Sequence, residues 1–363
     1  MTEKELHSVP LHLAKVKLAK KNNECTYALS VPLPIPNVER DMDGDNHTTV
    51  TEFLLLGLSE ESEQEDVVFG LFLGMYMVTI SGNLLIILAI SYDPHLHTPM
   101  YFFLAHLYSV DICFSSVTVP KALVNHMVGS KSISYTECMM QVYFLFAFGN
   151  MDSFLLSVMA YDRYVAICHP LHYTLIMRPR LCVLLVAISW VITNLHALLH
   201  TLLLVRLTFC SHNAVPHFYC DLYPLLKLSC SDTFINDVTA FAEGAVVFLV
   251  PFTCIVVSYV YIFSNVLKMP SVQGIRKAMS TCGSHLTVVC LFYGVVLGVY
   301  MHPSSSYSLQ DAMASVFFTV VIPMTNPFLY SLRNCDMKGA LRKIILRSLN
   351  WKFVALRGRA GGK

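Results

Sequence analysis

Charged residues are scarce in this chain. Lys, Arg, Asp and Glu make up only 13% of its 363 residues, whereas 55% are hydrophobic. A soluble domain of this length cannot bury so much apolar surface, so a water-soluble globular class is excluded. The net charge is +1 and no basic stripe is interleaved with aromatic residues, so nothing in the sequence indicates nucleic-acid binding.

Motifs of enzymes and transporters are also missing. The chain has no Gly-x-Ser-x-Gly sequence, no phosphate-binding loop and no His-rich metal cluster. No internal repeat with a period of roughly 20–50 residues is present, and the chain has no obvious inverted halves. A membrane enzyme and a transporter or channel therefore stay as alternatives without a motif to support them.

The first 66 residues differ from the rest. Residues 11–18 are apolar but interrupted by two lysines, so they lack the unbroken core of a signal peptide. Three prolines between residues 32 and 36 favour extended chain. We predict that residues 1–41 are a disordered extension or no part of the native protein, with Met42 as the natural start. Residues 39–66 are acidic and contain a glycosylation sequon at Asn46.

Seven long apolar segments follow. Several exceed the ~18 residues that a membrane-spanning helix requires. Backbone groups in lipid must pair within the chain, and continuous apolar runs do not fit alternating barrel strands, so these segments are predicted to be helices. The predicted fold class is an all-α membrane protein whose seven-helix bundle occupies residues 67–332. The segments are residues 67–92, 100–119, 139–168, 181–204, 238–263, 279–300 and 312–332.

Lys and Arg near the helix ends predict the orientation. They occur between the third and fourth segments, between the fifth and sixth, and in residues 333–363, which hold nine Lys/Arg against one acid. The positive-inside rule places these regions in the cytoplasm and the acidic residues 1–66 outside. Leu341, Ile344 and Ile345 alternate with basic residues, which predicts a short interfacial helix before the cytoplasmic tail.

Five motifs occur in order along the chain, and together they are specific. The sequence resembles the vertebrate olfactory receptors of the larger, tetrapod-type class (class II), within the rhodopsin-like G-protein-coupled receptors. The match covers about residues 46–347, and it departs from the family pattern at Asp152, Thr325 and Cys335. The motifs are Leu96–Leu104 (LHTPMYFFL), Met159–Cys168 (MAYDRYVAIC), Ser258-Tyr259, Lys277–Leu286 (KAMSTCGSHL) and Pro323–Asn334 (PMTNPFLYSLRN).

The resemblance implies a receptor without enzymatic activity or an organic cofactor. Its implied ligand is a small hydrophobic odorant, and its implied partners are membrane lipid and a heterotrimeric G protein of the olfactory stimulatory type, which raises cyclic AMP. The implied location is the plasma membrane of olfactory sensory cilia. A related chemosensory receptor for an endogenous small molecule, expressed elsewhere, fits the same motifs.

An acid beside a permanent cation closes the third segment, at Asp162 and Arg163. Such a pair is tolerated at the membrane surface, where Arg163 either anchors the helix or faces a protein partner. The resemblance implies that Asp162 holds Arg163 at rest and releases it toward the G protein. The other residues of this implied switch are Tyr164, Tyr259, Asn326, Pro327 and Tyr330.

Two acids, Asp111 and Asp152, lie at mid-membrane depth. Their charges repel unless the carboxylates are protonated or bridged by a cation. The resemblance implies a sodium ion held with Asn83 and Asn326, and a protonated hydrogen-bonded pair is the alternative. For His285, also inside the membrane, we expect a hydrogen bond between helices rather than a metal ligand.

Four cysteines fall in the outer regions, and they allow three pairings. The resemblance implies the bridges Cys138–Cys220 and Cys210–Cys230, with free thiols as the alternative. The other cysteines are interpreted as packing residues or free thiols.

The predicted ligand pocket lies in the outer half of the bundle. Helical spacing places its third-segment residues on adjacent faces. Plain helix packing is the alternative for each residue. Glu243 either pairs with a ligand amine or is protonated or turned to outer water. The pocket residues are Leu145, Phe146, Gly149, Asn150, Ser153, Glu243, Tyr293, Val296 and Thr319.

Overall fold

The computed structural model describes residues 17–21, 24–28, 50–57, 62–209, 213–268, 271–301, 309–331 and 336–344. The chain divides into two compact units, Met1–Thr48 and Thr49–Lys363. In the first, β1 (Lys17–Lys21) and β2 (Glu24–Ala28) form an antiparallel hairpin. That residues 1–41 are a disordered extension or no part of the native protein stays a prediction.

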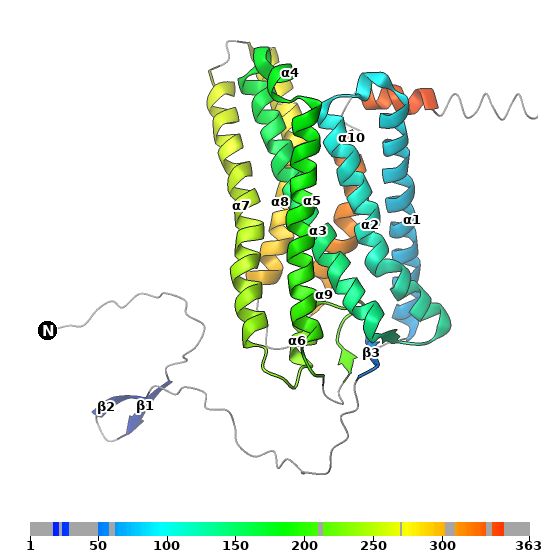
Figure 1. Ribbon diagram of the computed structural model, residues 1–363, viewed down its shortest axis with the longest axis vertical. Coiled ribbons are helices and arrows are strands. Elements are labelled where there is room, and N and C mark those ends of the chain that lie inside the picture. Colours follow the sequence, from blue (N-terminus) through cyan, green and yellow to red (C-terminus); the bar gives the residue numbers. More distant parts are fainter. Residues whose placement is uncertain are drawn as a thin grey trace, which may run out of the picture. The chain divides into compact units, whose positions relative to one another are not determined.

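The second unit is a helical bundle (Figure 1). Within the described residues, seven helices are long and apolar enough to cross a membrane, as predicted. The seventh span is built from three consecutive pieces, the middle one a π-helix. The helices are α1 (Ser62–Tyr92), α2 (Pro99–Val128), α3 (Tyr135–Cys168), α5 (Pro179–Val205), α7 (Phe234–Val266), α8 (Val272–Met301), and the seventh-span pieces α9 (Leu309–Val316), η3 (Phe317–Val321) and α10 (Ile322–Ser331).

Several helices are longer than their apolar runs. We expected the second to end near residue 119, but α2 continues to Val128 and stops at Gly129, which adopts a left-handed φ of 66°. Its last turns carry polar residues, which end the hydrophobic run without ending the helix. The start of α3 is fixed by a capping box, in which Ser134 and Glu137 exchange side-chain and backbone hydrogen bonds. Pro at the first position starts both α2 and α5.

A small sheet covers one end of the bundle. Its strands β3 (Glu52–Leu55), β4 (Ser132–Ser134) and β5 (Ala214–Val215) are ordered β4-β3-β5. Phe53 is fully buried and packs edge-on against Phe209. The short helix α6 (Leu222–Lys227) follows at this end. We call it the sheet end, and Figure 1 shows it at the bottom.

The opposite end, which we call the tail end, carries the C-terminal helix. Residues 336–344 are helical, which agrees with the predicted interfacial helix. Lys343 Nζ lies 2.8 Å from Asp93 Oδ2, beside η1 (Pro94–Leu96). Hydrogen bonds from Lys343 and His95 hold the pKa of Asp93 well below its ordinary value. Met337 and Ala340 are buried against the bundle, so the helix lies on it rather than leaving it.

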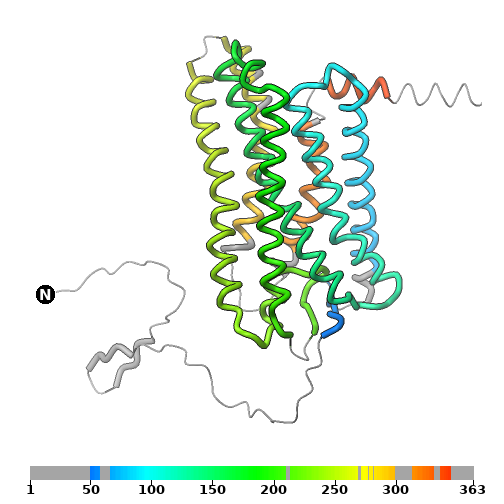
Figure 2. Tube along the Cα trace, in the orientation of Figure 1, coloured from blue at the N-terminus to red at the C-terminus, as the bar shows by residue number. Residues whose placement is uncertain are grey.

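Helix α3 is the axis of the arrangement (Figure 2). It contacts α2, α5, α7 and α8. Its buried residues extend from Cys138 near the sheet end to Arg163 and Val165 near the tail end. Because α3 packs against other helices along its length, it connects the sheet end of the bundle with the tail end.

Candidate functional site

A cavity opens between the helices toward the sheet end. It encloses about 990 Å³ of space not filled by atoms, part of it open to solvent. Five of the predicted pocket residues line it: Leu145, Phe146, Gly149, Asn150 and Val296. The lining that the sequence analysis missed is His196, His200, Tyr219, Asp221, Leu222, Tyr223, Val142, Ala240, Gly244, Phe248, Val295, Ser315 and Phe318.

Three predicted pocket residues, Ser153, Tyr293 and Thr319, are not among the lining residues. The hydroxyls of Ser153 and Tyr293 are hydrogen-bonded at 2.8 Å, which joins α3 to α8. The Thr319 hydroxyl donates to the carbonyl of Ser315, a lining residue, at 2.8 Å. The hydroxyls of Ser153, Tyr293 and Thr319 are thus engaged by neighbouring groups, and a role of these residues in ligand binding stays a prediction.

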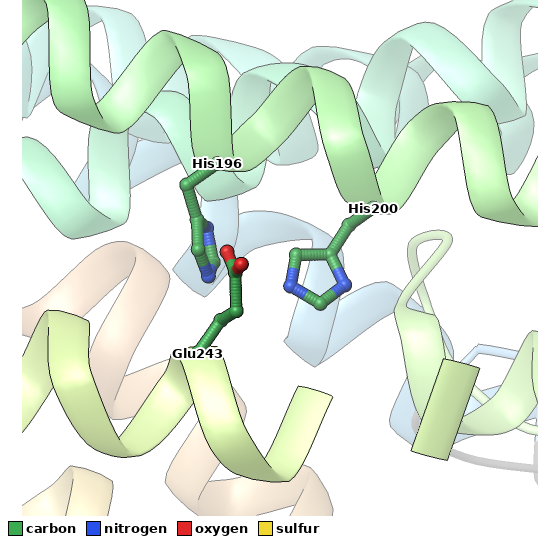
Figure 3. Close-up of side chains that lie close together, drawn as sticks. All are labelled: His196, His200 and Glu243. Carbon is green, nitrogen blue, oxygen red and sulfur yellow. The ribbon is translucent and has the colours of Figure 1, made fainter. Parts of the chain in front are cut away.

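One wall of the cavity is polar and comes from α5, where His196 and His200 line it. Glu243 of α7, the remaining predicted pocket residue, lies beside these histidines but is not among the lining residues. His196, His200 and Glu243 place one donor atom each within 4.8 Å of one another (Figure 3). This group was not predicted from the sequence, in which no His-rich metal cluster is evident. The local signal was the i, i+4 spacing of His196 and His200, which puts both side chains on one helix face. Glu243 joins them only through the packing of α7 against α5, which the sequence does not show.

Neighbouring side chains fix the two imidazoles. The Asn150 amide lies 2.9 Å from His196 Nδ1. The Phe146 ring stacks on His200 with centroids 5.0 Å apart. The Nε2 atoms of both histidines are buried without a hydrogen-bond partner among the described residues. Each unpartnered buried nitrogen costs about 1–3 kcal/mol, so this wall is poised to accept a ligand atom.

A disulfide closes the sheet end of the cavity. Cys138 on α3 is bonded to Cys220, and both residues are fully buried. Gln141 supports the junction, because its amide donates to the Val117 carbonyl and accepts from the Cys220 backbone N–H, both at 2.8 Å. Cys230 is also disulfide-bonded. Its expected partner Cys210 lies outside the described residues, as does the sequon at Asn46.

Asp221, beside this disulfide, lines the cavity outside the membrane-spanning helices. Burial raises the pKa of its carboxyl, which the Leu222 N–H partly offsets by a hydrogen bond. The acid therefore binds its proton more tightly than an exposed aspartate does.

The mid-membrane acid Asp111 is held by hydrogen bonds from the seventh span. Asn326 donates to both oxygens of Asp111, at 3.0 and 3.1 Å. Asn83 donates to the carbonyls of Thr79 and Pro323. The Oδ1 atoms of Asn83, Asp152 and Asn326 are buried without a hydrogen-bond partner among the described residues. Oxygen atoms of this kind are the ligands that alkali and alkaline-earth cations take.

Polar contacts also connect the helices at the tail end. Tyr173, in α4 (Tyr173–Ile176), donates to Asp162 Oδ1 at 2.8 Å. This contact was not predicted, and burial together with Asp162 raises the pKa of the Tyr173 hydroxyl. The Tyr164 hydroxyl is 3.1 Å from His169 Nε2, in the loop that follows α3. Arg163 is only 5% exposed, so its charge is enclosed within the bundle.

His285 joins three helices, as expected of an inter-helix hydrogen bond. Its Nε2 donates to the Leu156 carbonyl on α3 at 3.0 Å. Its Nδ1 consequently accepts from the Tyr259 hydroxyl on α7 at 2.9 Å. The expectation of an inter-helix hydrogen bond at His285 is confirmed.

Comparisons with known proteins agree with this architecture. Residues 72–348 match the model of the family described as "Olfactory receptor". The chain belongs to the olfactory receptor family. The receptor is 60% identical over 305 residues to Olfactory receptor 1f45 of Rattus norvegicus, which covers 84% of this chain and 97% of the relative. It is 57% identical to Olfactory receptor 1F1 and 58% identical to Olfactory receptor 1J2, both of Homo sapiens, each over 98% of the relative.

Family membership decides between a receptor, a membrane enzyme and a transporter or channel, which the sequence left open. The relatives are receptors and not enzymes, so the receptor performs no covalent chemistry. Seven spans in a family of this kind place it in a membrane as a multi-pass protein. The sheet-end cavity is the described site that best fits a small ligand.

Proposed function

We propose that the receptor binds a small volatile odorant in the sheet-end cavity and then activates a heterotrimeric G protein of the olfactory stimulatory type, raising cyclic AMP. The observation that carries this proposal is the cavity itself, because it is mainly apolar, has a few polar groups and lies under a disulfide-anchored loop. Such a site suits a small hydrophobic molecule that needs orientation by only a few hydrogen bonds.

The proposed orientation puts the sheet end outside the cell and the tail end in the cytoplasm of a sensory cilium. The Cys138–Cys220 bridge supports it, because disulfides persist in oxidising compartments. The Lys and Arg residues gathered toward the tail end support it as well. In the alternative, a receptor expressed in another tissue, an endogenous ligand would bind the same cavity and activate a G protein in the same way.

The tail end offers an apolar surface to the G protein. Leu171, in η2 (Pro170–His172) between α3 and α4, is 92% exposed. Leu267 at the end of α7 and Val272 at the start of α8 are also strongly exposed. Exposed apolar residues outside the spans are typical anchors for a protein partner. Movement of α3, α7 and α8 around Arg163 would then connect the cavity to that surface, with Pro327 permitting α10 to bend.

The test is a cyclic-AMP reporter screen of an odorant panel on cells that express the receptor and the olfactory G protein. A Gly149→Leu variant is expected to raise the effective concentration of any active odorant at least about tenfold, equivalent to about 1.4 kcal/mol. A Cβ there already lies 3.4 Å from the Phe114 ring and 3.5 Å from Phe318, so a larger side chain must extend into the cavity.

The matched control is Gly74→Leu, on the exposed face of α1, where a Cβ meets nothing within 4 Å. Its odorant potencies are expected to equal those of the wild type. A Gly149→Leu receptor that reaches the surface and keeps every potency would contradict the assignment of the ligand to this cavity.

We also propose that a sodium ion occupies the mid-membrane site at rest. The side chains of Asp111, Asp152, Asn83 and Asn326 would hold it, and its charge would offset the repulsion between the two acids. The unpartnered buried oxygens support this assignment. Removing one carboxylate with Asp111→Asn is expected to abolish any dependence of basal signalling on sodium, whereas the exposed Asp232→Asn control should keep it. A sodium dependence that survives Asp111→Asn argues against the site.

A further inference from the structure

The cluster of His196, His200 and Glu243, of which the two histidines line the cavity, is not explained by recognition of a hydrophobic molecule. His196 is 6% and His200 2% exposed, and Glu243 is half-buried. In Figure 3 the Glu243 carboxylate reaches from α7 into the space between the two rings of α5. No hydrogen bond or ion pair connects Glu243 to either ring within the described residues, although the donor atoms lie within 4.8 Å of one another.

We propose that these three side chains bind a divalent transition metal ion, of which Zn²⁺ is the representative, in the wall of the cavity. Two neutral imidazoles and one carboxylate are a donor set that zinc commonly takes. Nitrogen donors disfavour Na⁺, Mg²⁺ and Ca²⁺, which prefer oxygen ligands. The carboxylate would balance half of the charge of the ion.

The state of the two histidines supports the assignment. Each has a buried Nε2 without a hydrogen-bond partner among the described residues. A metal ion would satisfy both atoms at once. The i, i+4 spacing on α5 lets one ion reach both rings, as in other helical zinc sites. The arrangement therefore contains two independent features of a metal site, the donor cluster and the unpartnered nitrogens directed at it.

Residues behind the histidines are suited to hold them. The Asn150 amide lies 2.9 Å from His196 Nδ1. Rotating that amide by half a turn would present its oxygen, which accepts a hydrogen bond from Nδ1–H and leaves the Nε2 lone pair for the metal. Phe146 packs on His200 and edge-on to His196, which limits how far either ring can turn.

The geometry needs only a small adjustment. Zinc bonds of about 2.0–2.1 Å in a tetrahedral site bring donor atoms to within roughly 3.3 Å of one another. Glu243 is half-buried and its side chain is long, so a change of its rotamer can close the gap. Three protein donors leave a fourth position, and because both histidines line the cavity, that position faces it. Water or a lone pair of a cavity ligand would fill it.

The test uses purified full-length receptor in lipid nanodiscs, titrated with Zn²⁺ in the absence of odorant and G protein. The wild type is expected to bind one Zn²⁺ that neither Mg²⁺ nor Na⁺ displaces. Glu243→Gln and His200→Gln are each expected to weaken this binding at least about tenfold, since even residues behind metal ligands matter by 10–100-fold. The matched control is His106→Gln on α2, where Nδ1 is already bonded to the Phe102 carbonyl.

The control should keep the wild-type affinity. Glu243→Gln preserves the shape of a half-buried side chain, so it supplies the decisive comparison if a histidine variant does not fold. The proposal is overturned if the wild type binds no more Zn²⁺ than the His196→Gln/His200→Gln double variant, or if Glu243→Gln leaves the affinity unchanged. Because no signalling is measured, either result is independent of the proposed odorant and G-protein functions.

Discussion

Replacing Arg163 with alanine is expected to reduce odorant-evoked cyclic AMP to less than about a tenth of the wild-type response, equivalent to at least about 1.4 kcal/mol of coupling. Arg163 is a permanent cation enclosed at the tail end, where it is only 5% exposed. Alanine removes the positive charge that we propose moves from the bundle toward the G protein.

The control for that experiment is Arg180→Ala, an exposed arginine at the same end of the bundle. It is expected to signal normally, because exposed charges contribute little beyond general electrostatics. Equal surface expression of both variants, measured with an antibody to an N-terminal tag, separates loss of signalling from loss of protein. An Arg163→Ala receptor with a full odorant response would make Arg163 a membrane anchor, the alternative that the sequence left open.

Replacing Cys220 with serine is expected to lower the free energy of unfolding by about 2–5 kcal/mol. The bridge joins residues that are 82 positions apart and fully buried, so it restricts a long segment of chain. Beside the bridge, the amide oxygen of Gln141 accepts a hydrogen bond from the backbone N–H of Cys220. Without it the loop that covers the cavity loses its attachment to α3. Thermal inactivation of detergent-solubilised receptor measures the change.

Cys254→Ser provides the comparison for the disulfide. Cys254 is a free, exposed cysteine on α7, so its replacement removes a thiol without removing a bridge. Its inactivation temperature is expected to stay close to that of the wild type, whereas Cys220→Ser should inactivate well below it and reach the cell surface poorly. Coincident inactivation curves for the two variants would show that the bridge does not stabilise the bundle.

The helices could be predicted from the sequence because lipid leaves few choices. Long apolar runs must form helices when no water can pair with the backbone, and the seven runs correspond to the seven spans. Their ends were less accurate, since the last turns of α2 carry Lys121, Asn125 and His126 and no longer look hydrophobic. Hydropathy indicates which residues contact lipid, whereas helix α2 continues beyond the segment that contacts lipid.

The residues of the site were only partly predictable, because the sequence does not show how each helix is rotated about its own axis. Gly149 and Asn150 line the cavity, and helical spacing along α3 is enough to place them on adjacent faces that point the same way into the bundle. His196, His200 and Glu243 belong together only because α7 turns Glu243 toward α5, and that rotation follows from packing along the whole helix. The bond from Tyr173 to Asp162 depends in the same way on how the loop after α3 folds back.

The central claim is that a ligand in the sheet-end cavity switches a G protein at the tail end. Odorant-stimulated nucleotide exchange, measured with purified receptor in nanodiscs and purified stimulatory G protein, tests it most directly. The account predicts faster exchange when an odorant identified in the reporter screen is added to the wild type, and no acceleration with Arg163→Ala. An odorant that binds the wild-type receptor yet leaves the exchange rate unchanged would contradict it.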